Sequence, residues 1–187
     1  MKKLILTLCC IILTAMPVYA KETVDLTADA KTEIDMTMDA PTATYTLSYS
    51  SQEGSNINAK QAADYINGYI LLSGEEFSFN DVVGERTKER GFVPGNQVSG
   101  TSVTKGIGGG ICKISTMLHE LCLTTGMQIT EHHNHTIGVT YAAPGRDAAV
   151  AWGILDYRFI NTSESPIQIY CTYDDVNRQF HVSFTNL

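Results

Sequence analysis

The stretch Gly106-Ile107-Gly108-Gly109-Gly110-Ile111-Cys112 joins a flexible glycine turn to a helix. After it, apolar side chains recur at helical spacing between Ile114 and Leu121, and Gly126 is placed to end the helix. The pattern predicts a helix over residues 112–125. One face of this helix is apolar, so the helix must pack against a core.

Cys112 is predicted to be a reactive thiol. A cysteine at a helix N-terminus faces free backbone N–H groups and the positive end of the helix dipole, which favour the thiolate. It lies off the apolar stripe, on the face shared with Ser115, Thr116 and His119. His119 is too far along the helix axis to act as its base. A base must therefore come from another element.

The remaining pattern predicts one further helix and several strands. The helix covers residues 59–72, with Asn58 as its N-cap and Gly74 at its end. Strands are predicted at residues 45–50, 76–80, 128–141, 149–152, 155–161, 166–173 and 179–185. We therefore expect a single α+β domain in which two main helices pack on a mainly antiparallel sheet.

The histidines after the cysteine helix are candidate bases. Period-two alternation over residues 128–141 places His133 and His135 on the apolar face, where they would approach Cys112. Asp147 is the candidate group to orient the imidazole. The alternative is that both histidines are structural residues at the edge of the core.

A metal site is the other interpretation of this cluster. His132, His133 and His135, with Cys112 or Asp147, are acceptable zinc ligands. However, neighbouring histidines on a strand point to opposite faces, and no H-x-x-x-H or C-x-x-C spacing is present. We expect neither a metal nor another cofactor.

The N-terminal residues are predicted to direct export. Lys2 and Lys3 precede an apolar stretch, and Ala20 ends a small-residue cleavage pattern, so residues 1–20 are predicted to be a signal peptide. Residues 21–44 are predicted to be an exposed, acidic leader rich in Thr, Asp and Ala, and residues 45–187 the folded domain. The mature protein is then periplasmic or extracellular, with no stable membrane anchor.

Charge and cysteine content limit the partners. The formal net charge is −7, and loss of the two lysines of the signal gives −9, which disfavours nucleic acid. The cysteines outside the signal are Cys112, Cys122 and Cys171, an odd number. Cys112 is the expected free thiol. Cys122 and Cys171 are predicted core residues, with a disulfide between them as the alternative.

A cluster of acidic and basic residues follows the predicted strand at residues 76–80. It includes Glu85, Arg86, Lys88, Glu89 and Arg90. Such a cluster is typical of a solvated loop or helical turn. Contact of Arg86 or Arg90 with a substrate is the alternative.

Several motifs together resemble the VanW family. They are Glu76-Phe77-Ser78-Phe79-Asn80, Val83-Gly84-Glu85-Arg86-Thr87, Gly108-Gly109-Gly110-Ile111-Cys112, Glu131-His132-His133-Asn134-His135 and Pro144-Gly145-Arg146-Asp147. Lys113 stands where the family usually has Gln, and Asn134 replaces the proline of the usual His-Pro-His. The resemblance implies a role in the cell envelope.

Two functions follow from the residues and the resemblance together. The first is a thiol hydrolase or transpeptidase acting on amide bonds of peptidoglycan stem peptides. Its expected catalytic residues are Cys112, His133 or His135, and Asp147; its expected substrate contacts are Gly108, Gly109, Gly110, Ser115, Arg86 and Arg146. The second is a non-catalytic module that binds peptidoglycan or another wall ligand and contributes to envelope maintenance or glycopeptide resistance. The module requires no activated thiol.

Overall fold

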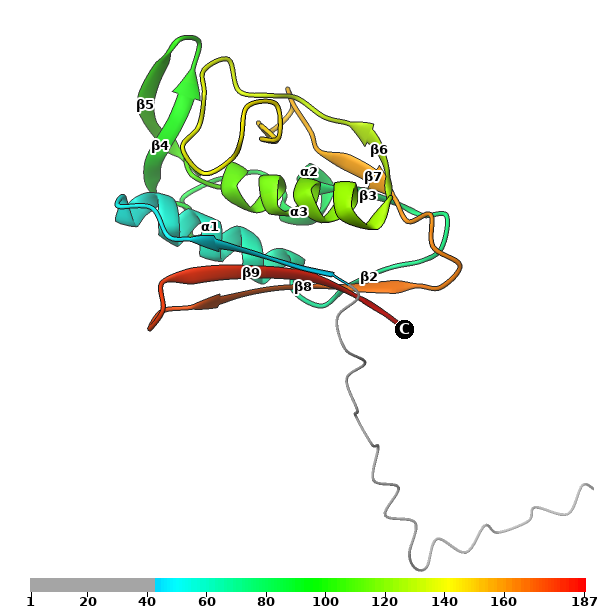
Figure 1. The fold of residues 1–187 in the computed structure, drawn as a ribbon. Helices are drawn as coiled ribbons and strands as arrows, with labels where there is room; N and C mark the ends of the chain where they lie inside the picture. The colour runs from blue at the N-terminus through cyan, green and yellow to red at the C-terminus, as the bar shows by residue number, and fades with distance from the viewer. Residues whose placement is uncertain (1–42) are drawn as a thin grey trace, which may run out of the picture. The chain divides into compact units, whose positions relative to one another are not determined.

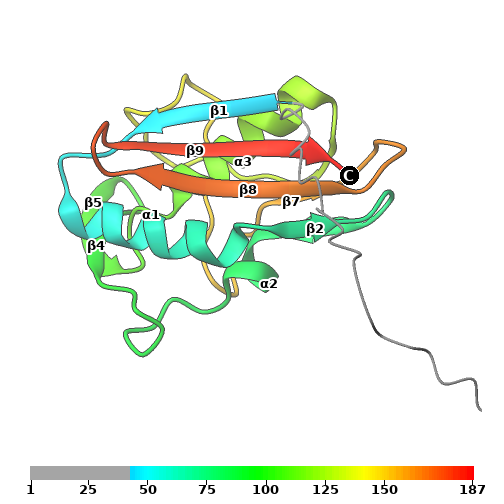
Figure 2. The same ribbon diagram turned by 90° about the horizontal axis from the view of Figure 1, so that it is seen from below.

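Four antiparallel strands form the floor of the fold in the computed structural model, which describes residues 43–187 (Figure 1). β1 (Ala43–Ser48) pairs with β9 (Gln179–Asn186), which pairs with β8 (Ile167–Asp174), which pairs with β2 (Tyr69–Leu71). The predicted signal peptide and nearly all of the predicted leader lie outside the described residues. Figure 2 shows the strand order β1-β9-β8-β2 from below.

Two helices cover one face of this sheet. α1 (Glu53–Ile66) and α3 (Cys112–Thr125) lie above β8, β9 and β1 in Figure 1. The alternating inward side chains of β8 and β9 and the apolar stripes of both helices are fully buried together. Each such side chain stabilises the fold by about 1.5–3 kcal/mol relative to exposure, so this interface is the core.

A second, three-stranded sheet lies at one end of the helices. β3 (Glu76–Ser78) and β6 (Gln128–Glu131) both pair with β7 (Arg158–Ile160), and the short helix α2 (Phe79–Val83) follows β3 directly. The Phe159 ring centroid lies 5.0 Å from that of Phe77 and 5.7 Å from that of Phe184 in β9. Aromatic packing therefore joins the second sheet to the first.

A two-stranded hairpin rises at the other end. β4 (Pro94–Ser99) and β5 (Ser102–Ile107) pair antiparallel and turn at Gly100, which has a φ of 58°. Most side chains of the hairpin are exposed. The end of β5 runs directly into the glycine turn that precedes α3.

The predicted α+β class is correct, and the helix at residues 112–125 is confirmed, including Gly126 as its left-handed C-cap. Residues 43–187 form three helices and three sheets, however, where we expected two main helices on one sheet. No helix among residues 43–187 has the length and apolar character that crossing a membrane requires. Cys122 and Cys171 are buried free thiols, as expected of core residues, and the alternative disulfide is absent from these residues.

The first predicted helix was misplaced. α1 spans Glu53–Ile66, six residues before the expected start at residue 59, and the chain then enters β2. Asn58 is therefore an interior residue of α1 and not its cap. Sequence periodicity missed the first turns because polar residues, Ser55 and Asn56, occupy buried positions there.

The long strand predicted at residues 128–141 was also wrong. β6 ends at Glu131, and residues 132–150 form an irregular segment. Period two therefore does not apply beyond residue 131, and His133 and His135 do not share a strand face. Residues 149–152 form no strand, and β7 covers only part of the strand predicted at residues 155–161.

Asn58 connects three parts of the chain from the interior of α1. Its Nδ2 donates to the carbonyl oxygens of Val93 and Gly109, each at 2.8 Å, and its Oδ1 accepts from the Val93 N–H at 2.8 Å. Its side chain is fully buried. These bonds hold the start of β4 and the glycine turn against α1.

Replacing Asn58 should destabilise the protein strongly. Asn58→Ala leaves the buried polar groups of Val93 and Gly109 without partners, and we expect a loss of about 2–4 kcal/mol in the free energy of unfolding. Urea denaturation measures this value. Ile57→Ala, at a 39% exposed position of the same helix, is the control and should cost far less. Equal effects of the two substitutions would contradict the role assigned to Asn58.

Candidate functional site

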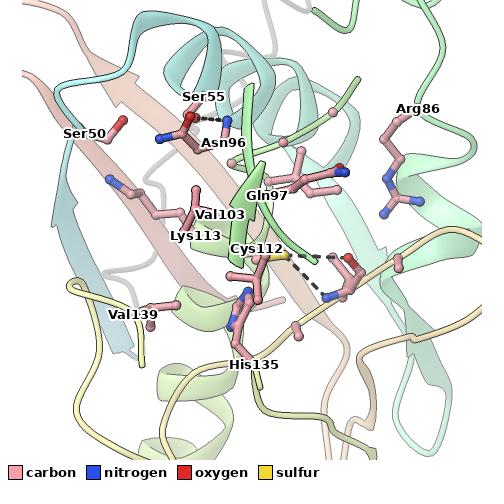
Figure 3. Close-up of a pocket in the computed structure, with 18 of the residues that line it drawn as sticks. Ser50, Ser55, Arg86, Asn96, Gln97, Val103, Cys112, Lys113, His135 and Val139 are labelled. Carbon is pink, nitrogen blue, oxygen red and sulfur yellow. Dashed lines mark hydrogen bonds between the residues drawn. The ribbon is translucent and has the colours of Figure 1, made fainter. Parts of the chain in front are cut away.

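A cavity of about 580 Å³ opens at the N-terminus of α3. Its wall comes from the hairpin β4–β5, the glycine turn, residues 137–141 and residues 149–152. Figure 3 shows side chains from these segments turned toward a common space around Cys112. Segments far apart in the sequence thus build one site around the cysteine.

The glycine turn is packed so tightly that side chains are excluded from it. A Cβ atom on Gly109 would lie 2.3 Å from the Gly95 carbonyl oxygen. A Cβ atom on Gly110 would lie 2.5 Å from the Cβ of Ser55, and the φ of 106° at Gly110 is one that L side chains rarely adopt. The three glycines therefore line the cavity with backbone alone.

Cys112 is the first residue of α3 and is held by the segment opposite. The Val150 N–H donates to Cys112 Sγ at 3.5 Å, and the thiol is 3.6 Å from the Val150 carbonyl oxygen (Figure 3). Among residues 43–187, no backbone carbonyl accepts a hydrogen bond from the N–H groups of Gly110 and Cys112. These two donors are therefore unpaired at the start of α3.

His135 lies between Cys112 and Asp147. It lines the cavity beside Cys112 (Figure 3), and its Nδ1 is 2.7 Å from Asp147 Oδ2. Asp147 Oδ2 also accepts from the His135 backbone N–H at 2.7 Å. Only 7% of the His135 side chain and 9% of the Asp147 side chain are exposed, so this pair is shielded from water.

Burial and the neighbouring charges and hydrogen bonds shift the pKa values of His135 and Asp147 in opposite directions. Burial lowers the pKa of His135, but hydrogen bonding and the negative charges of Cys112 and Asp147 outweigh it and raise the pKa above 6.5. For Asp147, burial raises the pKa, but its hydrogen bonds to His135 and Asn134 outweigh burial and lower it. The arrangement favours an imidazolium next to a carboxylate.

The irregular segment that carries His135 is fixed by the backbone and side chain of Asp147. Asn134 Nδ2 donates to the Asp147 carbonyl oxygen at 2.9 Å and to Oδ1 at 3.2 Å. His132 Nε2 is 2.8 Å from the same carbonyl oxygen. Next to Asp147, Ala148 accepts from Ser115 Oγ at 2.7 Å and donates to Thr116 Oγ1 at 3.0 Å, which ties the segment to α3.

The structure does not bring every expected residue to the cavity. His133 Nε2 bonds to Glu131 Oε1 at 2.9 Å, and His133 does not line the cavity. Arg146 is paired with Glu120, and Ser115 is buried under Ala148, so neither lines the cavity. Arg86 and the three glycines do line it.

The histidine cluster does not form a metal site. Within residues 43–187 no group of three or more metal-ligating side chains converges. His132 instead stacks on His119, with ring centroids 4.1 Å apart and planes 4° apart. Burial, reinforced by the neighbouring His132, lowers the pKa of His119 to about 4, which keeps this inner ring neutral.

Sequence reasoning missed two cavity residues. Lys113 Nζ donates to the Ser48 carbonyl oxygen at 2.7 Å and lies 5.6 Å from the Tyr141 ring centroid; burial lowers its pKa. Burial, followed by the charges of Cys112 and Asp147, raises the pKa of Tyr141, so the phenol stays protonated. The Gln-to-Lys departure at Lys113 was the one available signal; Tyr141 had been assigned to a strand.

Comparisons with known proteins place the chain in a family. The family model described as VanW like protein matches residues 54–184. An uncharacterized protein, YoaR, of Bacillus subtilis (strain 168) is 38% identical over 120 residues, 64% of this chain and 40% of that protein. Vancomycin B-type resistance protein VanW of Enterococcus faecalis (strain ATCC 700802 / V583) is 31% identical over 130 residues, 66% of this chain and 47% of that protein.

The chain thus matches less than half the length of either relative. No solved structure matches it. The family match runs along the chain from α1 through α3 into β9. It includes Cys112, His135 and Asp147. This chain belongs to the VanW-like protein family.

Proposed function

We propose that this protein is a thiol-dependent hydrolase or transpeptidase that acts on amide bonds of peptidoglycan stem peptides. The observation that carries the proposal is the placement of His135 between the cavity thiol of Cys112 and the buried carboxylate of Asp147. A nucleophile, a base and a group that orients the base are the parts that acyl transfer requires.

The chemistry follows from the three positions. The imidazolium of His135 stabilises the thiolate of Cys112, which attacks the carbonyl carbon of a substrate amide. His135 then gives its proton to the departing amine, and a thioester remains on Cys112. Water completes hydrolysis and a second amine completes transpeptidation, and in both cases His135 takes the proton of the attacking group.

Backbone donors beside the sulfur support the same proposal. The N–H groups of Gly110 and Cys112 are free at the start of α3, where the helix dipole also favours negative charge. An oxyanion that forms near Cys112 is stabilised by such donors, typically by about 3–4 kcal/mol for each. The side-chain-free glycine turn leaves room for the carbonyl to approach.

The substrate class is supported by the family and by the shape of the site. One relative is named for vancomycin resistance, and the family resemblance implies a role in the cell envelope. The predicted export signal would place the protein there. The cavity is about 580 Å³ and is lined by apolar, neutral polar and charged side chains, a size and a mixture that suit a peptide segment.

Substitution of the two candidate histidines tests the mechanism. His135→Ala should lower turnover of purified muropeptides by about 10²–10⁴-fold, because the base is lost. It should also slow alkylation of Cys112 by iodoacetamide near neutral pH. His133→Ala is the matched control and should leave both rates close to those of the unmodified protein. Mass spectrometry follows both products and the alkylated cysteine.

The same experiment separates the enzyme from a binding module. A slow Cys112 whose alkylation is independent of His135 would contradict the proposal. In that case Cys112→Ala should still bind peptidoglycan sacculi in a pull-down, as a non-catalytic wall-binding protein would. For the enzyme, Cys112→Ala should abolish turnover while the unfolding temperature stays near that of the unmodified protein.

The His135–Asp147 pair should also make stability depend on pH. The pKa of His135 is raised above its unfolded value of 6.5, so its contribution is complete below 6.5 and is lost as the pH rises through the folded pKa. The difference in unfolding free energy between the unmodified protein and His135→Asn should therefore be larger at about pH 5.5 than at about pH 9. Denaturant titrations at both pH values measure it. Equal differences would contradict the ion pair.

A further inference from the structure

Arg86 lines the cavity, and two nitrogens of its guanidinium group have no hydrogen-bond partner among residues 43–187. Nη1 donates to the Gly84 carbonyl oxygen at 2.8 Å. Nε and Nη2, the two nitrogens of the adjacent edge, are buried and have no partner among residues 43–187. Buried polar groups in proteins are nearly always hydrogen-bonded, so two free donors side by side need an explanation.

Negative charge is present near Arg86, because the charges of Cys112 and Asp156 raise its pKa, but neither group forms an ion pair with it. No carboxylate of the described residues forms a salt bridge with Arg86. By contrast, Arg146 pairs with Glu120, and Arg158 pairs with Glu76 and Asp156. Its guanidinium carbon lies 5.4 Å from the Phe79 ring centroid and 6.0 Å from that of Trp152. Burial lowers the pKa of Arg86 to about 10, so the group is still charged at neutral pH.

We propose that the Nε–Nη2 edge of Arg86 binds a carboxylate of the substrate, so that the site takes peptides with a free carboxylate near the amide bond that Cys112 attacks. The inference rests on the proposed function for its substrate. The two N–H groups of this edge match the two oxygens of one carboxylate in a bidentate pair. Arg86 and Cys112 line the same cavity, and the guanidinium is directed into it in Figure 3.

Trp152 is the exposed aromatic side chain beside the guanidinium group. The free nitrogens are shielded from water, and the guanidinium lies between the fully buried Phe79 and Trp152, which is 46% exposed. Displacing a surface indole requires no change in the core. Binding of a carboxylate at the Nε–Nη2 edge therefore requires a local side-chain movement, and the exposed Trp152 is the candidate for that movement.

Matched alkylating reagents test the inference without any need for turnover. Iodoacetate and iodoacetamide, and 3-bromopropionate and 3-bromopropionamide, differ within each pair by a carboxylate against a neutral amide. The rate ratio of acid to amide is measured at Cys112 by mass spectrometry on the full chain and is compared with the same ratio for glutathione. For at least one reagent length we expect an enhancement of about tenfold, as a charge-assisted hydrogen bond gives.

Variants identify the cation responsible. Arg86→Gln should return the ratio to that of glutathione, and Arg86→Lys should give an intermediate value because the charge remains while the fork is lost. Lys113→Gln, at the lysine that lines the cavity, is the control and should keep the preference for the acid. An acid preference that survives Arg86→Gln but is lost in Lys113→Gln or His135→Ala would overturn the inference.

Competition in the unmodified protein keeps the test valid if Arg86→Gln does not fold. Acetate should slow alkylation by the acid reagents, and acetamide should not. Inorganic phosphate that competes more strongly than acetate would indicate a phosphate subsite and would overturn the carboxylate assignment. An acid-to-amide ratio equal to that of glutathione would overturn it as well.

The test of Arg86 gives a result that can be distinguished from the test of the proposed function. The absolute alkylation rates and their dependence on His135 test the activated thiol. The acid-to-amide ratio tests Arg86, because activation of the thiol speeds both reagents of a pair alike. If Cys112 reacts as an ordinary thiol but the preference for the acid reagent is strong and depends on Arg86, the protein has a carboxylate-binding site and the proposed catalysis is contradicted.

Discussion

The contact between the glycine turn and its two neighbouring backbones sets the geometry of the whole site. Gly109 meets Gly95 in β4, and Gly110 meets Ser55 in α1, at distances that leave no space for a Cβ atom. Asn58 closes the junction with hydrogen bonds to Val93 and Gly109. Because α3 begins directly after this turn, the same contact fixes where Cys112 lies relative to α1 and the hairpin.

A second constraint, centred on Asp147, positions the opposite wall. Residues 132–150 have no regular backbone pairing, and the Asp147 carbonyl and carboxylate replace it by bonding to His132, Asn134 and His135. The next residue, Ala148, is tied to α3 through Ser115 and Thr116. The carboxylate that orients His135 therefore belongs to the same unit that anchors the segment. Orientation of the imidazole and local stability are coupled for this reason.

Sequence patterns predicted the parts of this fold that depend on local periodicity. The helix α3 was predictable because its apolar stripe and Gly126 cap are both local signals. The interior role of Asn58 was not, because its partners Val93 and Gly109 are distant in the sequence. For the candidate site, the glycine turn and the helix start pointed to Cys112 and Asp147 was proposed as the orienting group, but alternation could not separate His133 from His135.

The reason for that failure lies at Glu131. Its carboxylate accepts from the Asp156 N–H at 2.9 Å and bonds to His133, so a side chain takes over from the backbone ladder where β6 ends. Beyond this point His135 donates its N–H to the Asp147 carboxylate at 2.7 Å and not to a neighbouring strand. Hydrogen bonds between side chains and backbone thus decide which histidine faces Cys112. The alternation of apolar and polar residues does not reveal these hydrogen bonds.

Asn134 shows how this chain keeps that arrangement without the proline of the usual family pattern. Proline would restrict the backbone directly through its ring. Asn134 instead bonds to both the carbonyl oxygen and Oδ1 of Asp147, while His135 occupies Oδ2. Both carboxylate oxygens are therefore engaged, and rotation of the carboxylate would break bonds at each. In this chain the direction of the His135 ring therefore depends on the Asn134 side-chain amide, which acts through the Asp147 carboxylate.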